Sequence, residues 1–231
     1  MKNLNIFSLV AEYDNAKSGG VLNKPNVSFV NEDSSVRYLI DIKIEYNYVD
    51  LGLPSGLKWA TCNVGATSPD QAGLYFAWGE TTGYTAEQVP VVRAFTKDEY
   101  NAGPAYSIST ELTLAQDAAH INMGGNWRMP TKDEYQEMID NCNRVWTDDY
   151  NGTGIKGRIY TSKVNGNSVF IPAAGYCSSS SVDRVGSNGY YWSASCNTSD
   201  GAWNLSFNSG KTYYLTSSYR YSGFSVRGVF K

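Results

Sequence analysis

The chain has 231 residues, of which 42% are hydrophobic and 14% aromatic, and this composition excludes a disordered polypeptide because the apolar surface offsets the loss of chain entropy. Its length suits one domain of ordinary size, or one domain with a small appendage. The formal net charge of −3 gives no overall attraction to nucleic-acid phosphates or anionic membranes, so we expect neither a nucleic-acid partner nor membrane insertion.

Residues 1–46 differ in pattern from the rest and predict a β-rich N-terminal arm. Two short alternating stretches, 26–30 and 36–40, flank a polar turn and predict a hairpin. Residues 41–48 continue the alternation and predict a strand that leads into the main domain, residues 47–231. The arm would serve docking or oligomerisation; the alternative is that its strands are extra edge strands of the same domain.

Two short helices are predicted in the middle of the chain. One begins near Thr113, has Gln116 three residues later, and ends near His120. The other follows Thr131, an N-cap residue whose capping box is completed by Glu134. Apolar side chains then recur at helical spacing and predict one buried stripe, formed by Tyr135, Met138, Ile139 and Cys142.

After about residue 155, short strands and turns dominate the pattern. The stretches 168–172, 190–195 and 202–207 predict strands, the last followed by a turn at 208–210. A final strand is predicted over 224–229. The fold class is therefore α+β, with two short helices and a small twisted antiparallel sheet.

The histidine and cysteine residues limit the chemistry that this chain can perform. Cys62, Cys142, Cys177 and Cys196 are widely spaced and form no CxxC pair, so no zinc site is predicted. A Ser-His-Asp or Cys-His mechanism would have to use His120, which we interpret as a packed or helix-capping residue. We expect no cofactor and no metal.

Five motifs that follow one another in a fixed order carry a resemblance to a known family. They are the runs Val49–Ala60, Trp127–Thr131 with Glu134, Phe170–Tyr176, Tyr191–Ser193 and Gly223–Arg227. From about residue 47 onward, the chain resembles the major paralogous domain of Fibrobacter and Bacteroidetes type. That domain is similar to the C-type lectin-fold branch that includes formylglycine-generating enzymes, variable proteins of diversity-generating retroelements and phage tropism determinants. The resemblance implies a C-type lectin-like fold that binds a ligand through variable C-terminal loops.

The enzymes of this branch use a pair of cysteines in the last stretch before the C-terminus. Residues 213–229 contain no cysteine, so the resemblance implies that this chain is not an enzyme, and Arg128 is interpreted as an ion-pairing or carbonyl-capping residue. A formylglycine-generating-type oxidoreductase is the less favoured alternative. The paired carboxylates that a glycosidase would need are not expected, because we interpret the nearest pairs as solvated loop and helix-start acids, namely Asp148 with Asp149 and Asp133 with Glu134.

Two stretches near the C-terminus have the composition of binding loops. Residues 196–201 and 213–222 are rich in Tyr, Ser, Asn and Gly, which in antibodies give rigid aromatic contacts and adaptable hydrogen bonds. Randomisation of template adenines cannot place Lys, Glu, Gln, Met or Trp at an AAC codon, and neither stretch contains them. A free cysteine at position 196 agrees with such an origin. The alternative is an ordinary polar surface loop.

The predicted ligand-binding residues combine these stretches with two neighbouring framework positions. They are Tyr190, Cys196, Asn197, Thr198, Ser199, Asp200, Gly201, Ser206, Tyr213, Tyr214, Leu215, Thr216, Ser217, Ser218, Tyr219, Tyr221 and Ser222. The basic side chains of the tail predict a mildly basic binding face, while we expect Arg227 to anchor the sheet; the set is Lys211, Arg220, Arg227 and Lys231. Asp200 and Asn197 alone offer too few oxygens for calcium.

Together these features predict a diversified protein that binds a host cell-surface protein or glycan noncovalently. The resemblance implies a phage or prophage origin, with residues 1–46 docking to tail proteins. A homo-oligomer and a monomer are both compatible with the sequence. We expect a virion, or the cytoplasm before assembly, because residues 1–15 lack the pattern of a signal peptide. The alternative is a bacterial surface adhesin with fixed specificity.

Overall fold

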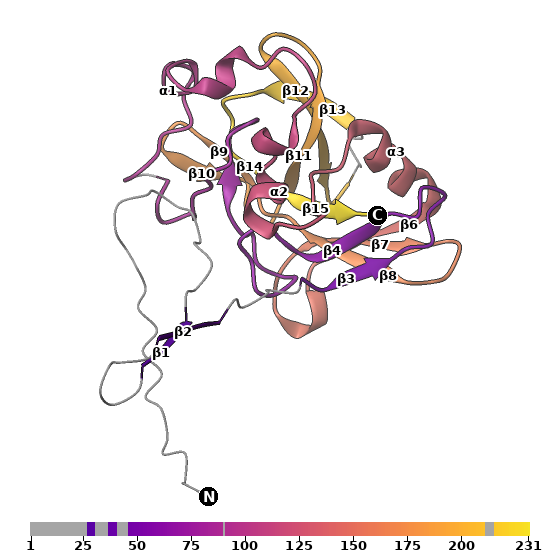
Figure 1. The fold of residues 1–231 in the computed structure, drawn as a ribbon. Coiled ribbons are helices and arrows are strands. Elements are labelled where there is room, and N and C mark those ends of the chain that lie inside the picture. Colours follow the sequence, from indigo (N-terminus) through magenta and orange to yellow (C-terminus); the bar gives the residue numbers. More distant parts are fainter. Residues whose placement is uncertain (1–26, 31–36, 41–45, 90, 211–214) are drawn as a thin grey trace, which may run out of the picture. The chain divides into compact units, whose positions relative to one another are not determined.

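The computed structural model describes residues 27–30, 37–40, 46–89, 91–210 and 215–231 (Figure 1). The chain divides into two units, Met1–Glu45 and Tyr46–Lys231. In the first unit, β1 (Val27–Val30) pairs antiparallel with β2 (Arg37–Ile40). The strands of the predicted hairpin are thus confirmed, whereas its turn and the predicted strand segment 41–45 lie outside the described residues.

Among the described residues of the second unit, a five-stranded sheet is accompanied by three smaller sheets. The order of the large sheet is β13–β12–β11–β14–β5. The β14 strand runs parallel to β11, and the other neighbours in this sheet are antiparallel. Its strands are β5 (Tyr75–Phe76), β11 (Asn188–Cys196), β12 (Gly201–Asn208), β13 (Leu215–Tyr219) and β14 (Phe224–Ser225). β11 and β12 contain the predicted strands 190–195 and 202–207.

The smaller sheets are antiparallel throughout. One has the order β15–β4–β3, another β6–β7–β8, and the third pairs β9 with β10. Their strands are β3 (Tyr48–Asp50), β4 (Lys58–Asn63), β6 (Cys142–Thr147), β7 (Gly157–Ser162), β8 (Ser168–Pro172), β9 (Tyr176–Ser178), β10 (Ser181–Asp183) and β15 (Arg227–Phe230). β8 coincides with the predicted strand 168–172, and β3 begins at the last residue of the predicted strand 41–48.

The helices are short, and α3 matches its prediction. Thr131 Oγ1 accepts the Glu134 N–H at 3.2 Å and Glu134 Oε2 accepts the Thr131 N–H at 2.8 Å, which confirms the capping box. The predicted stripe is buried, although Cys142 already belongs to β6. In Figure 1, α1 and α3 lie at opposite ends of the unit. The helical elements are α1 (Lys97–Asn101), α2 (Ala118–Met123), α3 (Lys132–Asn141) and the 3₁₀ turns Pro104–Ser107, Leu114–Gln116 and Tyr150–Gly152.

The helix predicted from Thr113 is in fact two elements. Its first part is the 3₁₀ turn, after which Asp117 has extended backbone with φ −94° and ψ 115°. The Asp117 carboxylate accepts the His120 N–H at 2.9 Å and so caps the start of α2. His120 therefore lies within α2 rather than at its end, with Nδ1 3.1 Å from the Trp127 carbonyl oxygen.

The strand predicted over 224–229 changes sheets halfway. β14 ends at Ser225 in the five-stranded sheet, and β15 begins at Arg227 in the sheet of β4 and β3. The buried Arg227 guanidinium ties β4 to β8 of the β6–β7–β8 sheet, since Nε donates to Asn63 Oδ1 at 2.9 Å and Nη2 donates to the Phe170 carbonyl at 3.1 Å. The prediction that Arg227 anchors the sheet is confirmed.

Alternate side chains of β11 and β12 enter two hydrophobic clusters. Trp192 and Ala202 belong to one cluster, and Tyr191, Leu205 and Phe207 belong to the other, which also contains the buried face of α3. Because successive strand side chains point to opposite faces, the large sheet separates the two clusters. The described residues are α+β, as predicted.

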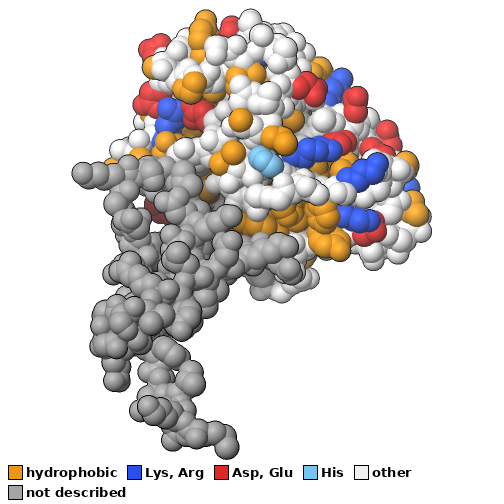
Figure 2. Space-filling view, in the orientation of Figure 1, with side chains coloured by type: hydrophobic (Ala, Val, Ile, Leu, Met, Phe, Trp, Pro, Cys, Tyr) orange, Lys and Arg blue, Asp and Glu red, His pale blue; other side chains and the backbone are white. Residues whose placement is uncertain are grey.

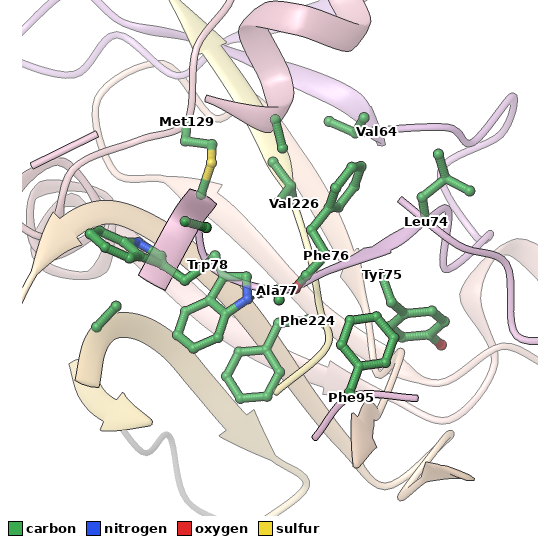
Figure 3. Packing of buried hydrophobic residues seen from close by; sticks show 14 of the residues in the cluster. Val64, Leu74, Tyr75, Phe76, Ala77, Trp78, Phe95, Met129, Phe224 and Val226 are labelled. Atoms are coloured by element: carbon green, nitrogen blue, oxygen red, sulfur yellow. Dashed lines mark hydrogen bonds between the residues drawn. The ribbon is translucent and has the colours of Figure 1, made fainter. Parts of the chain in front are cut away.

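The first cluster gathers aromatic rings around β14. Phe224 stacks on Trp192 with ring centroids 4.2 Å apart, and Figure 3 shows the ring of Phe76 on the side of Val226, away from the ring of Phe224. Trp78 Nε1 donates to the Ser193 carbonyl at 2.9 Å, and Trp192 Nε1 donates to the Phe76 carbonyl at 2.8 Å. Both indole N–H groups are therefore satisfied inside the apolar interior.

The outer surface of the second unit has mixed charge. On the face drawn in Figure 2, acidic and basic side chains are interspersed, which agrees with a net charge near zero. In the described part of the chain, no helix has both the length and the apolar character needed to cross a membrane.

Candidate functional site

Two neighbouring hollows open near the predicted binding stretches. The larger, here called the sheet hollow, has a volume of about 500 Å³ and is lined by Tyr176, Tyr190, Thr198, Asp200, Gly201, Ser217, Ser218, Tyr219, Ser222 and Phe224. The smaller, here called the helix hollow, has a volume of about 260 Å³ and is lined by Lys97, Tyr100, Asn101, Tyr106, Ser199, Asp200, Tyr219, Arg220 and Tyr221. Asp200 and Tyr219 line both hollows and therefore form a shared wall.

Packed aromatic rings form the floor of the sheet hollow. The rings of Tyr190 and Phe224 are 5.2 Å apart, and Tyr176 meets Tyr190 edge-to-face at 5.1 Å. Phe224 in turn stacks on Trp192 at 4.2 Å. The floor is continuous with the hydrophobic core, so it is held in place by close packing.

Hydroxyl groups line the rim of the sheet hollow. A Cβ atom placed on Gly201 would lie 2.7 Å from Ser217 Oγ and 2.9 Å from Thr198 Oγ1, so the two hydroxyls lie close to this glycine. Ser217 pairs with Trp203, and its side chain therefore lies on the opposite face of β13 from that of Ser218. The Ser218 hydroxyl lies on the face of Asn204, to which it is bonded.

β13 is fixed at the edge of the sheet by a buried asparagine as well as by the strand ladder. Asn204 Nδ2 donates to the Thr216 carbonyl and to Ser218 Oγ, each at 3.0 Å. Its Oδ1 accepts the Thr216 hydroxyl at 3.1 Å. Since Asn204 is fully buried, this network sets the position of the strand that carries Ser217, Ser218 and Tyr219.

Arg220 organises the loop between β11 and β12. Its side chain is 1% exposed and lies over the Trp78 ring at 4.5 Å from the centroid. The guanidinium donates to the carbonyls of Thr198, Gly201 and Ile108. A planar group with five donors is suited to tying several carbonyls together, so Arg220 joins the binding loop to the segment that follows α1.

Two interpretations of charge and cysteine need correction. The expected basic face is wrong for Arg220 and Arg227, because both are buried, while Lys211 lies outside the described residues. Cys196 is half-buried, with Sγ 2.8 Å from Arg220 Nη2. It therefore packs within the base of the loop and is not an outward-facing contact.

An ion pair joins two residues that line the helix hollow. Lys97 Nζ lies 4.0 Å from Asp200 Oδ2, and the side chains are 59% and 58% exposed. An exposed pair at this distance adds little stability. It places a cationic group beside the carboxylate of the shared wall.

The structure brings most of the predicted binding residues together. Those that line one or both hollows are Tyr190, Thr198, Ser199, Asp200, Gly201, Ser217, Ser218, Tyr219, Tyr221 and Ser222. Asn197 is exposed but lines neither hollow, and Tyr213 and Tyr214 lie outside the described residues.

Three other predicted residues, Leu215, Thr216 and Ser206, line neither hollow. Residues 215–219 form a strand rather than a loop, and Ser206 lies inside the sheet. Leu215 packs against the second hydrophobic cluster. Thr216 is bonded to Asn204. Ser206, on β12, is only 4% exposed and therefore offers no surface to a ligand.

Sequence reasoning missed the contribution of α1 and the loop after it. Thr96 caps α1 by accepting the Glu99 N–H at 3.3 Å, which is the same Thr-x-x-Glu pattern that predicted α3. Thr96 with Glu99 is therefore the sequence signal that could have predicted α1. The missed lining residues are Lys97, Tyr100, Asn101 and Tyr106 from this segment, Tyr176 from β9, and Arg220 and Phe224.

The residues considered for catalysis lie elsewhere and have structural contacts. Asp148 accepts the Trp146 Nε1–H at 3.0 Å, and Asp149 accepts the Gly154 N–H at 2.6 Å, in agreement with solvated loop acids. All four cysteines are free, and burial raises the pKa of Cys177 well above its ordinary value and that of Cys142 to about 11. Within the described ranges, no three His, Cys, Asp or Glu residues are grouped to hold a metal ion.

Comparison with family models, with curated proteins and with solved structures found no match. The functional interpretation therefore rests on the geometry of the two hollows and on the residues around them.

Proposed function

We propose that this protein is a recognition protein that holds its partner noncovalently against the two hollows. The observation that carries the proposal is the meeting of residues 198–201 with residues 217–222 around one concave surface. They belong to the two stretches, 196–201 and 213–222, whose composition is that of binding loops. The pairing of β12 with β13, which sets Gly201 opposite Tyr219, brings them together beside a packed aromatic floor.

The chemistry of this surface supports binding. Tyr219 is 61% exposed and stacks on Tyr221 with centroids 5.2 Å apart, so the pair offers a large aromatic contact at low entropic loss. Ser and Thr hydroxyls around it supply adaptable hydrogen bonds. Beneath them, Arg220 and Asn204 hold the loop and β13 in one arrangement, which reduces the ordering required on binding.

We further propose that the fold of the second unit is C-type lectin-like and that the protein is a diversified receptor-recognition protein of phage or prophage origin. Its partner would be a host cell-surface protein or glycan, and residues 1–46 would dock the unit to a tail. Support comes from the ordered motifs and from the amino acids that are missing from 196–201 and 213–222. A fixed-specificity bacterial adhesin would use the same hollows.

The genomic context separates these two origins. Diversification requires a reverse transcriptase gene nearby and a near-copy of the segment encoding about residues 186–229 that differs only at adenines. A locus with neither feature would exclude diversification and favour the adhesin.

The binding proposal is tested with arrays of bacterial surface glycans and of outer-surface proteins. We expect the wild-type protein to bind at least one member and the double variant Tyr219→Ala, Tyr221→Ala to lose roughly tenfold or more in affinity. The matched control is Tyr48→Ala, which removes a tyrosine of similar exposure, 54%, that lines neither hollow. Equal binding by the double variant and the wild type would refute the proposal.

A further inference from the structure

The residues that line the sheet hollow indicate which class of ligand it binds. This inference rests on the proposed function and makes it more specific. Its floor presents the partly exposed rings of Tyr176 and Tyr190 above the buried Phe224, and Tyr219 stands at its side. A volume of about 500 Å³ falls within the range of small-molecule sites. The hollow therefore suits one compact chemical unit better than a flat protein surface.

The rim supplies a dense set of hydroxyl groups. Ser218 Oγ accepts a hydrogen bond from Asn204, so its own proton is free to be donated into the hollow. Thr198 and Ser222, which also line the hollow, add two further hydroxyls. Such groups both donate and accept, as a polyhydroxylated ligand requires.

The hollow carries little net charge. Asp200 is its one acidic lining residue, no Lys, Arg or His lines it, and Lys97 lies 4.0 Å from the Asp200 carboxylate on the other side of the wall. A cation would be favoured by ring faces arranged around an empty centre. Here Tyr176, Tyr190 and Phe224 instead pack on one another within the floor.

We infer that the sheet hollow binds a neutral pyranose ring of a glycan and does so without calcium. One face of such a ring consists of C–H groups, which would stack on Tyr190, while its hydroxyls would bond Thr198, Ser218 and Asp200. Calcium takes six to eight oxygen ligands, and Asp200 is the single carboxylate lining the hollow.

The test uses the full-length protein and four neutral probes, the methyl glycosides of glucose, galactose, mannose and N-acetylglucosamine. Each is titrated to millimolar concentrations while backbone and tyrosine NMR signals are followed, with and without EDTA. We expect saturable shifts at Tyr190 and at 198–201 for at least one probe, unchanged by EDTA. Trimethylammonium is titrated in parallel as the cationic competitor.

Two variants connect binding to the hollow. Tyr190→Ala removes the stacking surface, and we expect its affinity for the glycoside to fall by roughly tenfold. Tyr190 packs on Phe224, so its replacement also removes a contact within the floor of the hollow. A second variant therefore changes a residue outside the floor. Ser218→Ala removes a hydroxyl that lines the hollow, and it too should weaken binding. Its control is Gly103→Ala, a substitution outside both hollows where the nearest atom to the added Cβ is 3.4 Å away.

The outcomes are distinct. Saturable, EDTA-insensitive binding that both variants weaken and Gly103→Ala does not would support the inference. Binding that EDTA abolishes, preference for trimethylammonium, or glycoside binding unchanged in both variants would overturn it. If no glycoside binds but a surface protein is held through Tyr219 and Tyr221, the inference fails and the proposed function stands. If neither binds, both fail.

Discussion

Arg220 shows how a single buried residue can hold a loop in place. Its guanidinium binds the carbonyls of Thr198, Gly201 and Ile108 and covers Trp78. From sequence, the same residue looks like a surface cation in a Tyr/Ser-rich loop. The structure buries it, because the carbonyls at the base of the loop need donors once they are removed from water.

We predict that Arg220→Met destabilises the second unit by about 2–4 kcal/mol, because it removes the guanidinium that donates to the buried Ile108 carbonyl and bridges it to the Thr198 carbonyl. Chemical denaturation measures this loss, and hydrogen exchange should be faster at residues 197–201. The control is Lys156→Met, at a side chain 47% exposed, where we expect a change within about 0.5 kcal/mol. Equal stability of Arg220→Met and wild type would show that the loop is held by other contacts.

At the scale of elements, α3 depends on a charged cap. Arg128 Nη1 and Nη2 bond the two Glu134 oxygens at 2.7 and 2.5 Å, and Arg128 Nη1 also donates to the Met129 carbonyl at 3.0 Å. The sequence interpretation of Arg128 as an ion-pairing and carbonyl-capping residue is thereby confirmed. Burial alone would raise the pKa of Glu134, but the hydrogen bonds from Arg128 and Thr131 outweigh it and hold that pKa below its ordinary value.

We predict that Glu134→Gln lowers the free energy of unfolding by about 1–3 kcal/mol at neutral pH. Because the pKa of Glu134 is depressed in the folded protein, its contribution is fully present above its ordinary pKa of 4.5 and is lost as the pH falls through the folded value. The stability difference between variant and wild type should therefore shrink under acid, as measured by urea unfolding at several pH values. The exposed Glu111→Gln is the control, and a difference independent of pH would contradict the assignment.

At the scale of the whole molecule, the chain consists of two units with a boundary between Glu45 and Tyr46. The second unit begins with anchored residues. The Tyr46 hydroxyl donates to the Asn122 carbonyl at 3.1 Å, and its ring meets Trp127 edge-to-face at 6.2 Å. A domain that begins at residue 47, as predicted from the sequence, would lack the Tyr46 side chain and both of these contacts.

We predict that residues 46–231 fold cooperatively without the first unit, because both hydrophobic clusters lie entirely within this range. Thermal unfolding should occur as one transition, with a midpoint within a few degrees of the full-length protein. A fragment starting at residue 48 should be less stable, since it lacks Tyr46. Insolubility or loss of the transition in 46–231 would show that the N-terminal segment belongs to the core.

The sequence by itself determined the elements whose signals are local. The Thr131–Glu134 capping box, the apolar stripe of α3, the apolar runs of β8 and β11 and the alternation in β12 all depend on neighbours within a few residues. Composition likewise marked 196–201 and 213–222, because their residue types are visible without knowledge of distance.

Only the tertiary structure decided which residues meet. The burial of Arg220 and Ser206, the break at Asp117, the change of sheet after Ser225 and the contribution of α1 to the helix hollow all depend on contacts between distant segments. The physical reason is that a side chain's exposure depends on what packs above it, and in this protein those partners lie up to a hundred or more residues away, as when Arg220 bonds the Ile108 carbonyl across 112 positions.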